Sequence, residues 1–178
     1  MREPLPAEQR AMELLRDVGV DQLPVPVEAI ASGLGADLTY EAYDGEVSGM
    51  LVRGDDGTAV IGVNSRHATT RQRFSVAHEI GHLVMHPGSP MFIDRFVRVN
   101  WRNGESNREE IEANAFAAEL LMPREAVERQ VERALTRSEF LTPQQLSKQL
   151  AKAFHVSPQA MSYRLENLGV VDPVGLIG

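Results

Sequence analysis

The chain of 178 residues has no cysteine, no long apolar run and no excess of basic residues. Without cysteine it has no disulfide framework and no metal site built on thiolates. No apolar stretch approaches the roughly 20 residues that span a bilayer. The charged start MREPLPAEQRAMELLRD also lacks the features of a signal peptide. We therefore expect a cytoplasmic protein that does not enter a membrane.

Acidic residues outnumber basic ones, which gives the chain a net charge of -7. A protein of this sign gains little from releasing the counterions around phosphates, so direct DNA binding is not expected. The hydrophobic fraction of 43% and the charged fraction of 24% are typical of globular proteins. The length suits one domain, or one domain with a small appendage.

Hydrophobic periodicity predicts several helices and a group of three strands in the first half of the chain. The predicted helices are Pro6–Val18, Val25–Leu34, Thr69–His86, Arg108–Leu121 and Pro123 to about Leu135. The predicted strands are Ala36–Tyr43, Val47–Arg53 and Thr58–Asn64, and Gly88–Ser106 is predicted to be a loop. These elements indicate an α+β fold. The third strand could lie at the sheet edge and pair with an extended peptide, or lie at the centre, which its apolar residues also allow.

The end of the chain predicts two short helices joined by a turn, each opened by a serine or threonine followed by proline. We divide the chain into a core of residues 1–136 and a helix-turn-helix-like tail of residues 137–178 packed on it. The second tail helix carries one basic residue, Arg164, and an apolar stripe. A structural role, or a dock for the substrate, is therefore favoured over DNA recognition.

The most specific motif is HEIGH, residues 78–82, within RFSVAHEIGHLVMH. His78 and His82 are four residues apart, so on a helix both imidazoles lie on one face. Two such nitrogens can bind one zinc ion at about 2.0–2.1 Å. Glu79 is rotated by about 100° on the helix and can act as general base toward a water molecule. Apolar flanks predict a buried helix, where clustered polar groups need partners such as a metal ion.

The third metal ligand must come from another segment. His86 lies about 12 Å from His78 along the helix axis, so it cannot join the same ion. It is either a neighbour of the ligands or simply a residue favoured at a helix end. The segment EEIEAN offers Glu110 as a ligand and Asn114, one turn later, as the partner of a histidine's second nitrogen. Glu112 remains a competing ligand.

The motifs RFSVAHEIGHLVMHP and EIEANAFAAELLMP, in this order, resemble those of the ImmA/IrrE family of zinc metallopeptidases. The likeness covers about Pro26–Pro123, and the tail also resembles a segment that often follows in this family. The resemblance implies His78, His82 and Glu110 as zinc ligands and Glu79 as general base. It further implies helices packed on a small three-stranded sheet and an intracellular protein. Several family members cleave a DNA-binding repressor.

We therefore predict a zinc-dependent endopeptidase with a protein substrate, in particular a helix-turn-helix transcriptional repressor. The alternative is a non-catalytic partner that binds a repressor or antitoxin without cleaving it, but such a protein would not need Glu79. To stabilise the oxyanion of the reaction, the sequence offers Tyr43, His155, Tyr163 and several arginines, and it does not choose among them.

Overall fold

The computed structural model describes residues 3–44, 46–88, 90–95, 104–137 and 141–171. In chain order the elements are α1 (Pro6–Asp17), α2 (Val27–Gly33), β1 (Ala36–Glu41), β2 (Val47–Arg53), β3 (Ala59–Asn64), α3 (Thr69–Met85), β4 (Met91–Arg95), α4 (Gly104–Leu121), α5 (Arg124–Arg137), α6 (Pro143–Phe154) and α7 (Pro158–Asn167). The predicted α+β class is confirmed. None of the described helices is long and apolar enough to cross a membrane.

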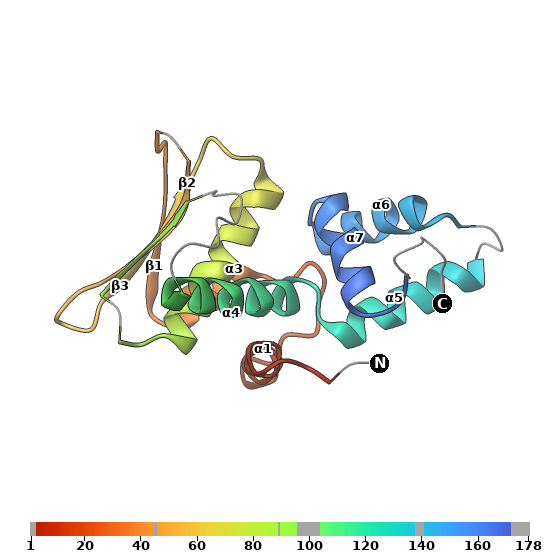
Figure 1. The fold of residues 1–178 in the computed structure, drawn as a ribbon, viewed down its shortest axis with the longest axis horizontal. Helices are drawn as coiled ribbons and strands as arrows, with labels where there is room; N and C mark the ends of the chain where they lie inside the picture. The colour runs from red at the N-terminus through yellow and green to blue at the C-terminus, as the bar shows by residue number, and fades with distance from the viewer. Residues whose placement is uncertain (1–2, 45, 89, 96–103, 138–140, 172–178) are drawn as a thin grey trace.

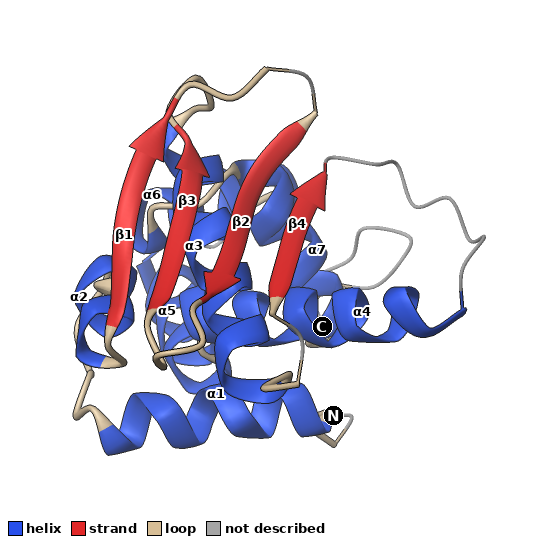
Figure 2. Ribbon diagram, turned by 90° about the vertical axis from the view of Figure 1, so that its left-hand side faces the viewer, coloured by secondary structure: helices blue, strands red, loops and turns tan. Residues whose placement is uncertain are grey.

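The strands form one mixed sheet in the order β1-β3-β2-β4. Strand β1 pairs parallel with β3, and β2 pairs antiparallel with both β3 and β4. Figure 2 shows the helices on one side of this sheet. Leu51, Ile61 and Val63 are fully buried beneath the helices, while Met91 and Ile93 are exposed on the opposite face. The strands therefore have one buried face and one open face.

The prediction of three strands is wrong by one, because β4 forms within the segment predicted to be a loop. Phe92 and Asp94 face the helices, whereas Met91 and Ile93 point away from them. Polar and apolar residues therefore do not alternate along β4, and no local pattern marks it as a strand. The strand forms because it pairs with the edge of β2.

Two other details of the predicted elements are resolved by the structure. Strand β3 lies between β1 and β2, so it is central and the edge alternative is wrong. Helix α4 begins at Gly104 rather than at Arg108. The edges of the described sheet are β1 and β4.

Helices α3 and α4 pack very closely, and Figure 1 shows α4 lying across α3 beside the sheet. A Cβ at Gly81 of α3 would lie 3.2 Å from Cα of Ala113 and 3.2 Å from the ring of Phe116, both on α4. This is tighter than ordinary van der Waals contact, so the absence of a side chain at Gly81 permits the approach. The close crossing sets the distance between the two predicted metal-binding motifs.

The predicted pair of tail helices is present as α6 and α7, at the end of the molecule away from the sheet (Figure 1). Thr142 caps α6 by accepting a hydrogen bond from the backbone N–H of Gln145, and Ser157 caps α7 in the same way. The division of the chain after residue 136 stays a prediction, since α5 continues to Arg137.

A buried ionic cluster joins the tail to α1 and α4. The guanidinium of Arg164 donates to Glu8 Oε1 at 3.0 Å and to Glu119 Oε2, and its Nε donates to the carbonyl of Met122 at 3.1 Å. The side chains of Arg164, Glu8 and Glu119 are each only 2% exposed. One arginine therefore bridges two buried carboxylates from distant parts of the chain.

Replacing this arginine should destabilise the whole fold. We expect Arg164→Met to lower the free energy of unfolding by about 3–5 kcal/mol, because it removes the positive charge from between two buried carboxylates. Adding Glu8→Gln and Glu119→Gln should recover part of the loss. The matched control is Arg66→Ala, which breaks an exposed pair with Asp44 and should cost less than about 1 kcal/mol. Urea denaturation measures all four proteins, and equal losses for Arg164→Met and Arg66→Ala would contradict this account.

Candidate metal centre

The two histidines of HEIGH converge at the buried face of α3. His78 and His82 are each 1% exposed. Their Nε2 atoms lie 3.0 Å apart, because a spacing of four residues places them one helical turn apart on one face. The predicted pairing of the two imidazoles is therefore present.

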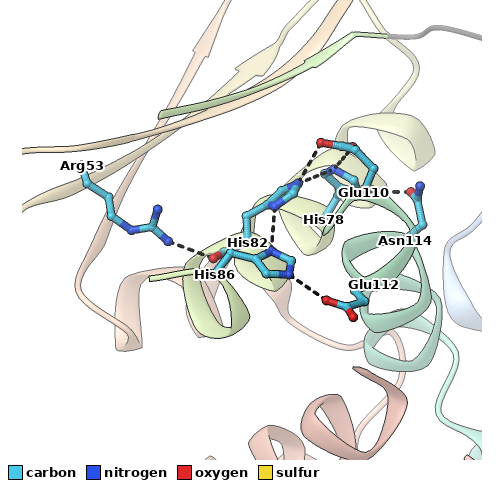
Figure 3. A network of polar contacts seen from close by, with 7 residues as sticks. All are labelled: Arg53, His78, His82, His86, Glu110, Glu112 and Asn114. Carbon is cyan, nitrogen blue, oxygen red and sulfur yellow. Dashed lines mark hydrogen bonds and ion pairs between the residues drawn. The ribbon is translucent and has the colours of Figure 1, made fainter. Parts of the chain in front are cut away.

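Helix α4 brings a carboxylate to this pair of nitrogens (Figure 3). Glu110 Oε2 lies 3.2 Å from His78 Nε2, and Glu110 Oε1 lies 3.3 Å from His82 Nε2. Burial opposes its charge, but its contacts with both histidines lower the pKa of Glu110 to about 2. The side chain is 38% exposed, so the cluster can be reached from solvent on the side of Glu110.

The chemistry of this cluster fits a metal ion. Three ligand atoms from His78, His82 and Glu110 lie within 4.8 Å of one another. Ligands bound to one tetrahedral zinc at about 2.0–2.1 Å are separated by about 3.3 Å, close to the spacings found here. Burial opposes a charge on His78, but the surrounding carboxylates of Glu110, Glu79 and Asp94 raise its pKa. Burial lowers the pKa of His82 despite its contact with Glu110, so only His78 of the two imidazoles is favoured as a cation in the metal-free protein.

Glu79 is buried beside the cluster, and the described residues offer it no hydrogen bond. It is 0% exposed, and neither carboxylate oxygen has a hydrogen-bond partner among the described residues. Burial, aided by the charges of Asp94 and Glu110, raises the pKa of Glu79 to about 8, despite the opposing effect of His78. Gly49 of β2 provides the space, since a Cβ there would lie 2.8 Å from Glu79 Oε1. Such a carboxylate is poised to exchange a proton near neutral pH.

The outer nitrogens of the two histidines contact different groups (Figure 3). His78 Nδ1 lies 3.1 Å from Asn114 Oδ1, as the one-turn spacing from Glu110 to Asn114 predicts. His82 Nδ1 lies 3.0 Å from His86 Nδ1, and His86 Nε2 lies 3.1 Å from Glu112 Oε2.

These contacts place His86 and Glu112 outside the cluster formed by His78, His82 and Glu110. His86 lies behind His82. Glu112, which competed with Glu110 as a ligand, contacts His86 and Arg108 instead. The group that can hold a metal with His78 and His82 therefore contains Glu110.

Two residues from the sheet hold His82 in place, and the sequence pattern indicates neither. The ring of Phe92 stacks on His82 with 4.0 Å between centroids. Arg53 donates to the carbonyl of His82 at 2.8 Å and lies over the Phe92 ring. Because β4 was not predicted, neither the stacking nor its support from β2 follows from the motifs alone.

Asp94 is the functional candidate that the sequence did not reveal. It forms a second group with His78 and Glu79 whose ligand atoms lie within 4.8 Å of one another. Burial raises the pKa of Asp94. The residue sits in a segment without periodicity, and the only local signal is one carboxylate directly after the apolar residues MFI. Pairing of β4 with β2 carries Asp94 to the site.

Of the residues that the sequence offers for oxyanion stabilisation, some lie away from the candidate metal centre and others make different contacts. His155 ends α6 and Tyr163 belongs to α7, both in the tail. The Tyr43 hydroxyl lies against Gly62, whose register partner Met50 faces away from the helices. Among the arginines, Arg71 lies on the metal-centre side, where it donates to Ser48 Oγ at 2.8 Å. Its charge offsets part of the rise that burial causes in the pKa of Asp94.

An HExxH helix that meets a carboxylate from a neighbouring helix is the arrangement of a metallopeptidase. Residues 33–166, more than half of the chain, match the peptidase family described as the IrrE N-terminal-like domain, and the chain belongs to this family. The predicted relationship to the ImmA/IrrE family is thereby confirmed. The comparison with curated proteins gives no match.

The unpaired carboxylate should destabilise the metal-free fold in a pH-dependent way. Because the pKa of Glu79 is raised from 4.5 to about 8, its contribution favours folding below pH 4.5 and is lost as the pH rises through about 8. We expect Glu79→Gln to stabilise the metal-free protein above pH 8 by up to roughly 5 kcal/mol, and to change little near pH 4.5.

Urea denaturation in the presence of a chelator measures this difference as a function of pH. The matched control is Glu109→Gln, which changes a partly exposed carboxylate of α4. A Glu79→Gln protein that is no more stable than the wild type above pH 8 would contradict the raised pKa.

Proposed function

We propose that this chain is a zinc-dependent endopeptidase that cleaves a transcriptional repressor of the helix-turn-helix type. The observation that carries the proposal is the buried, unpaired Glu79 beside two imidazoles and a carboxylate. A purely structural metal site would not need this acid, since burying it without partners destabilises the fold. Membership of a peptidase family supports the same activity. Because the proposed substrate acts on DNA, the proposed location is the cytoplasm.

His78, His82 and Glu110 would hold zinc, for which two imidazole nitrogens and one carboxylate oxygen are suitable ligands. When bound, zinc would supply Lewis acidity toward the attacking water and the peptide carbonyl. Glu79 accepts the proton of that water and then delivers it to the nitrogen of the leaving amine. In the metal-free protein burial raises the pKa of Glu79, and a cation held by the neighbouring ligands would favour its charged form, which is the form that accepts a proton.

Strand β4 is the proposed platform for the substrate. It is an edge of the described sheet and carries Phe92 and Asp94 beside the metal centre. The backbone N–H of Arg53 donates to the Pro90 carbonyl at 2.9 Å, so in the antiparallel register Ile93 is a position that does not bond to β2. Its N–H and carbonyl point outward, where an extended peptide can pair with them.

A proline at this position tests the platform. We expect Ile93→Pro to raise KM for the protein substrate severalfold, because it removes an outward N–H without removing a bond to β2. Ile93→Ala is the control, since it shortens the same exposed side chain but keeps the N–H. Steady-state kinetics with both variants decides the matter. Equal KM values for the two would remove β4 as the substrate platform.

The proposed metal and activity are tested together on purified protein. We expect about one zinc per chain by mass spectrometry, and loss of most of it in Glu110→Ala. Glu109→Ala, a change of the neighbouring carboxylate, should keep the metal. Manganese or iron in place of zinc would correct the identity of the ion, and no metal after zinc is supplied would overturn the peptidase.

Cleavage of candidate repressors is then compared between the wild type and Glu79→Gln. The variant should keep zinc and bind the repressor, while kcat/KM falls by roughly 10²–10⁴-fold. An unchanged effect on the repressor in cells would instead support the alternative, a partner that binds without cleaving.

The tail is proposed to support the core or to dock the substrate, and not to bind DNA. The only basic residue of α7 is Arg164, and its side chain is buried against Glu8 and Glu119. A helix that reads DNA needs exposed basic groups for phosphates and base edges. This arrangement supports a structural role for the helix.

A further inference from the structure

The two candidate histidine ligands are held by partners of different chemistry. His78 Nδ1 faces Asn114 Oδ1 at 3.1 Å, and an amide oxygen can only accept a hydrogen bond. His82 Nδ1 faces His86 Nδ1 at 3.0 Å, and an imidazole nitrogen can either donate or accept. The direction of this second bond must therefore be set by what lies beyond His86.

A carboxylate beyond His86 settles the direction. His86 Nε2 lies 3.1 Å from Glu112 Oε2, and an ionised carboxylate only accepts. A neutral His86 therefore carries its single ring proton on Nε2 and leaves Nδ1 as an acceptor. His82 must then carry its proton on Nδ1, which leaves the lone pair of His82 Nε2 directed toward Glu110 and His78. If His86 carried its proton on Nδ1 instead, His82 would carry its own proton on Nε2, at the nitrogen where a metal has to bind.

The surroundings keep this chain of hydrogen bonds in place. His82 and His86 are 1% and 9% exposed, and Phe92 stacks on the first of them. Glu112 is anchored by Arg108, whose Nε donates to Oε1 at 2.8 Å. Helix α4 thus supplies Glu110 to the inner nitrogen of His82 and Glu112 to the far end of the chain (Figure 3).

We propose that His86 and Glu112 form a hydrogen-bond relay that fixes the tautomer and orientation of His82 and thereby sets the metal affinity of the site. Both are positioning residues, because they act through His82 and do not touch the metal or the substrate. The inference rests on the metal centre of the proposed function, but it does not require that a repressor is the substrate.

The experiment measures the zinc affinity of the full chain by competition with a chelator. We expect His86→Phe to weaken zinc binding by about 10–100-fold, since partners of a metal-binding histidine typically contribute this much. Glu112→Ala should weaken binding less, in the same direction. The double variant should bind as His86→Phe does, because Glu112 acts only through His86.

Two further variants separate the relay from general damage to the fold. In His86→Asn, a side-chain oxygen replaces the accepting Nδ1, so affinity should partly return compared with His86→Phe. Glu109→Ala is the matched control on α4 and should leave zinc affinity unchanged. Nitrogen NMR of the zinc-loaded wild type should show the ring proton of His86 on Nε2. Thermal unfolding of the metal-free variants reports whether each one is folded.

Several outcomes would overturn the relay. These are an unchanged affinity in folded His86→Phe, additive losses in the double variant, or a ring proton on His86 Nδ1. If the wild type binds no zinc, the relay fails together with the metal centre. A wild type that binds zinc, shows the expected affinities and cleaves no repressor would overturn only the proposed function.

Discussion

The close approach of α3 and α4 is the constraint on which the rest of the structure depends. Gly81 and Ala113 bring the two backbones together, and this places Glu110 3.2 Å from one histidine nitrogen and 3.3 Å from the other. An extra methyl group at the crossing would have to push a backbone aside. The sheet then closes the opposite side, where Phe92 stacks on His82. The cluster is thus formed by α3, α4 and β4 together.

This arrangement gathers carboxyl groups in a place with little solvent. Glu79 has no partner among the described residues, and Asp94 lies close to it and to His78. Burial raises the pKa of both carboxylates. A fold selected for stability alone would pair such groups, as it does for Glu8 and Glu119 around Arg164. The contrast between two carboxylates that share a buried arginine and a buried carboxylate without a hydrogen bond among the described residues supports the candidate metal centre as a functional site.

The positions of the tail and the N-terminal helix also bear on the site. Arg164 binds Glu119 near the end of α4, the same helix that carries Glu110 and Glu112 earlier in its length. Helix α1 contributes Glu8 to this cluster. Segments far from the motifs in sequence therefore help to hold the helix that completes the metal centre.

The sequence by itself determined the features that depend on neighbours a few residues apart. Helical spacing was enough to pair His78 with His82 and Glu110 with Asn114, because residues four apart share a helix face. The same local rules predicted most helices and the first three strands. The tertiary structure alone decided what depends on contacts between distant segments, such as strand β4, Asp94 beside Glu79 and the link from His86 to Glu112. Pairing of strands and crossing of helices bring these groups together, and no local period records such contacts.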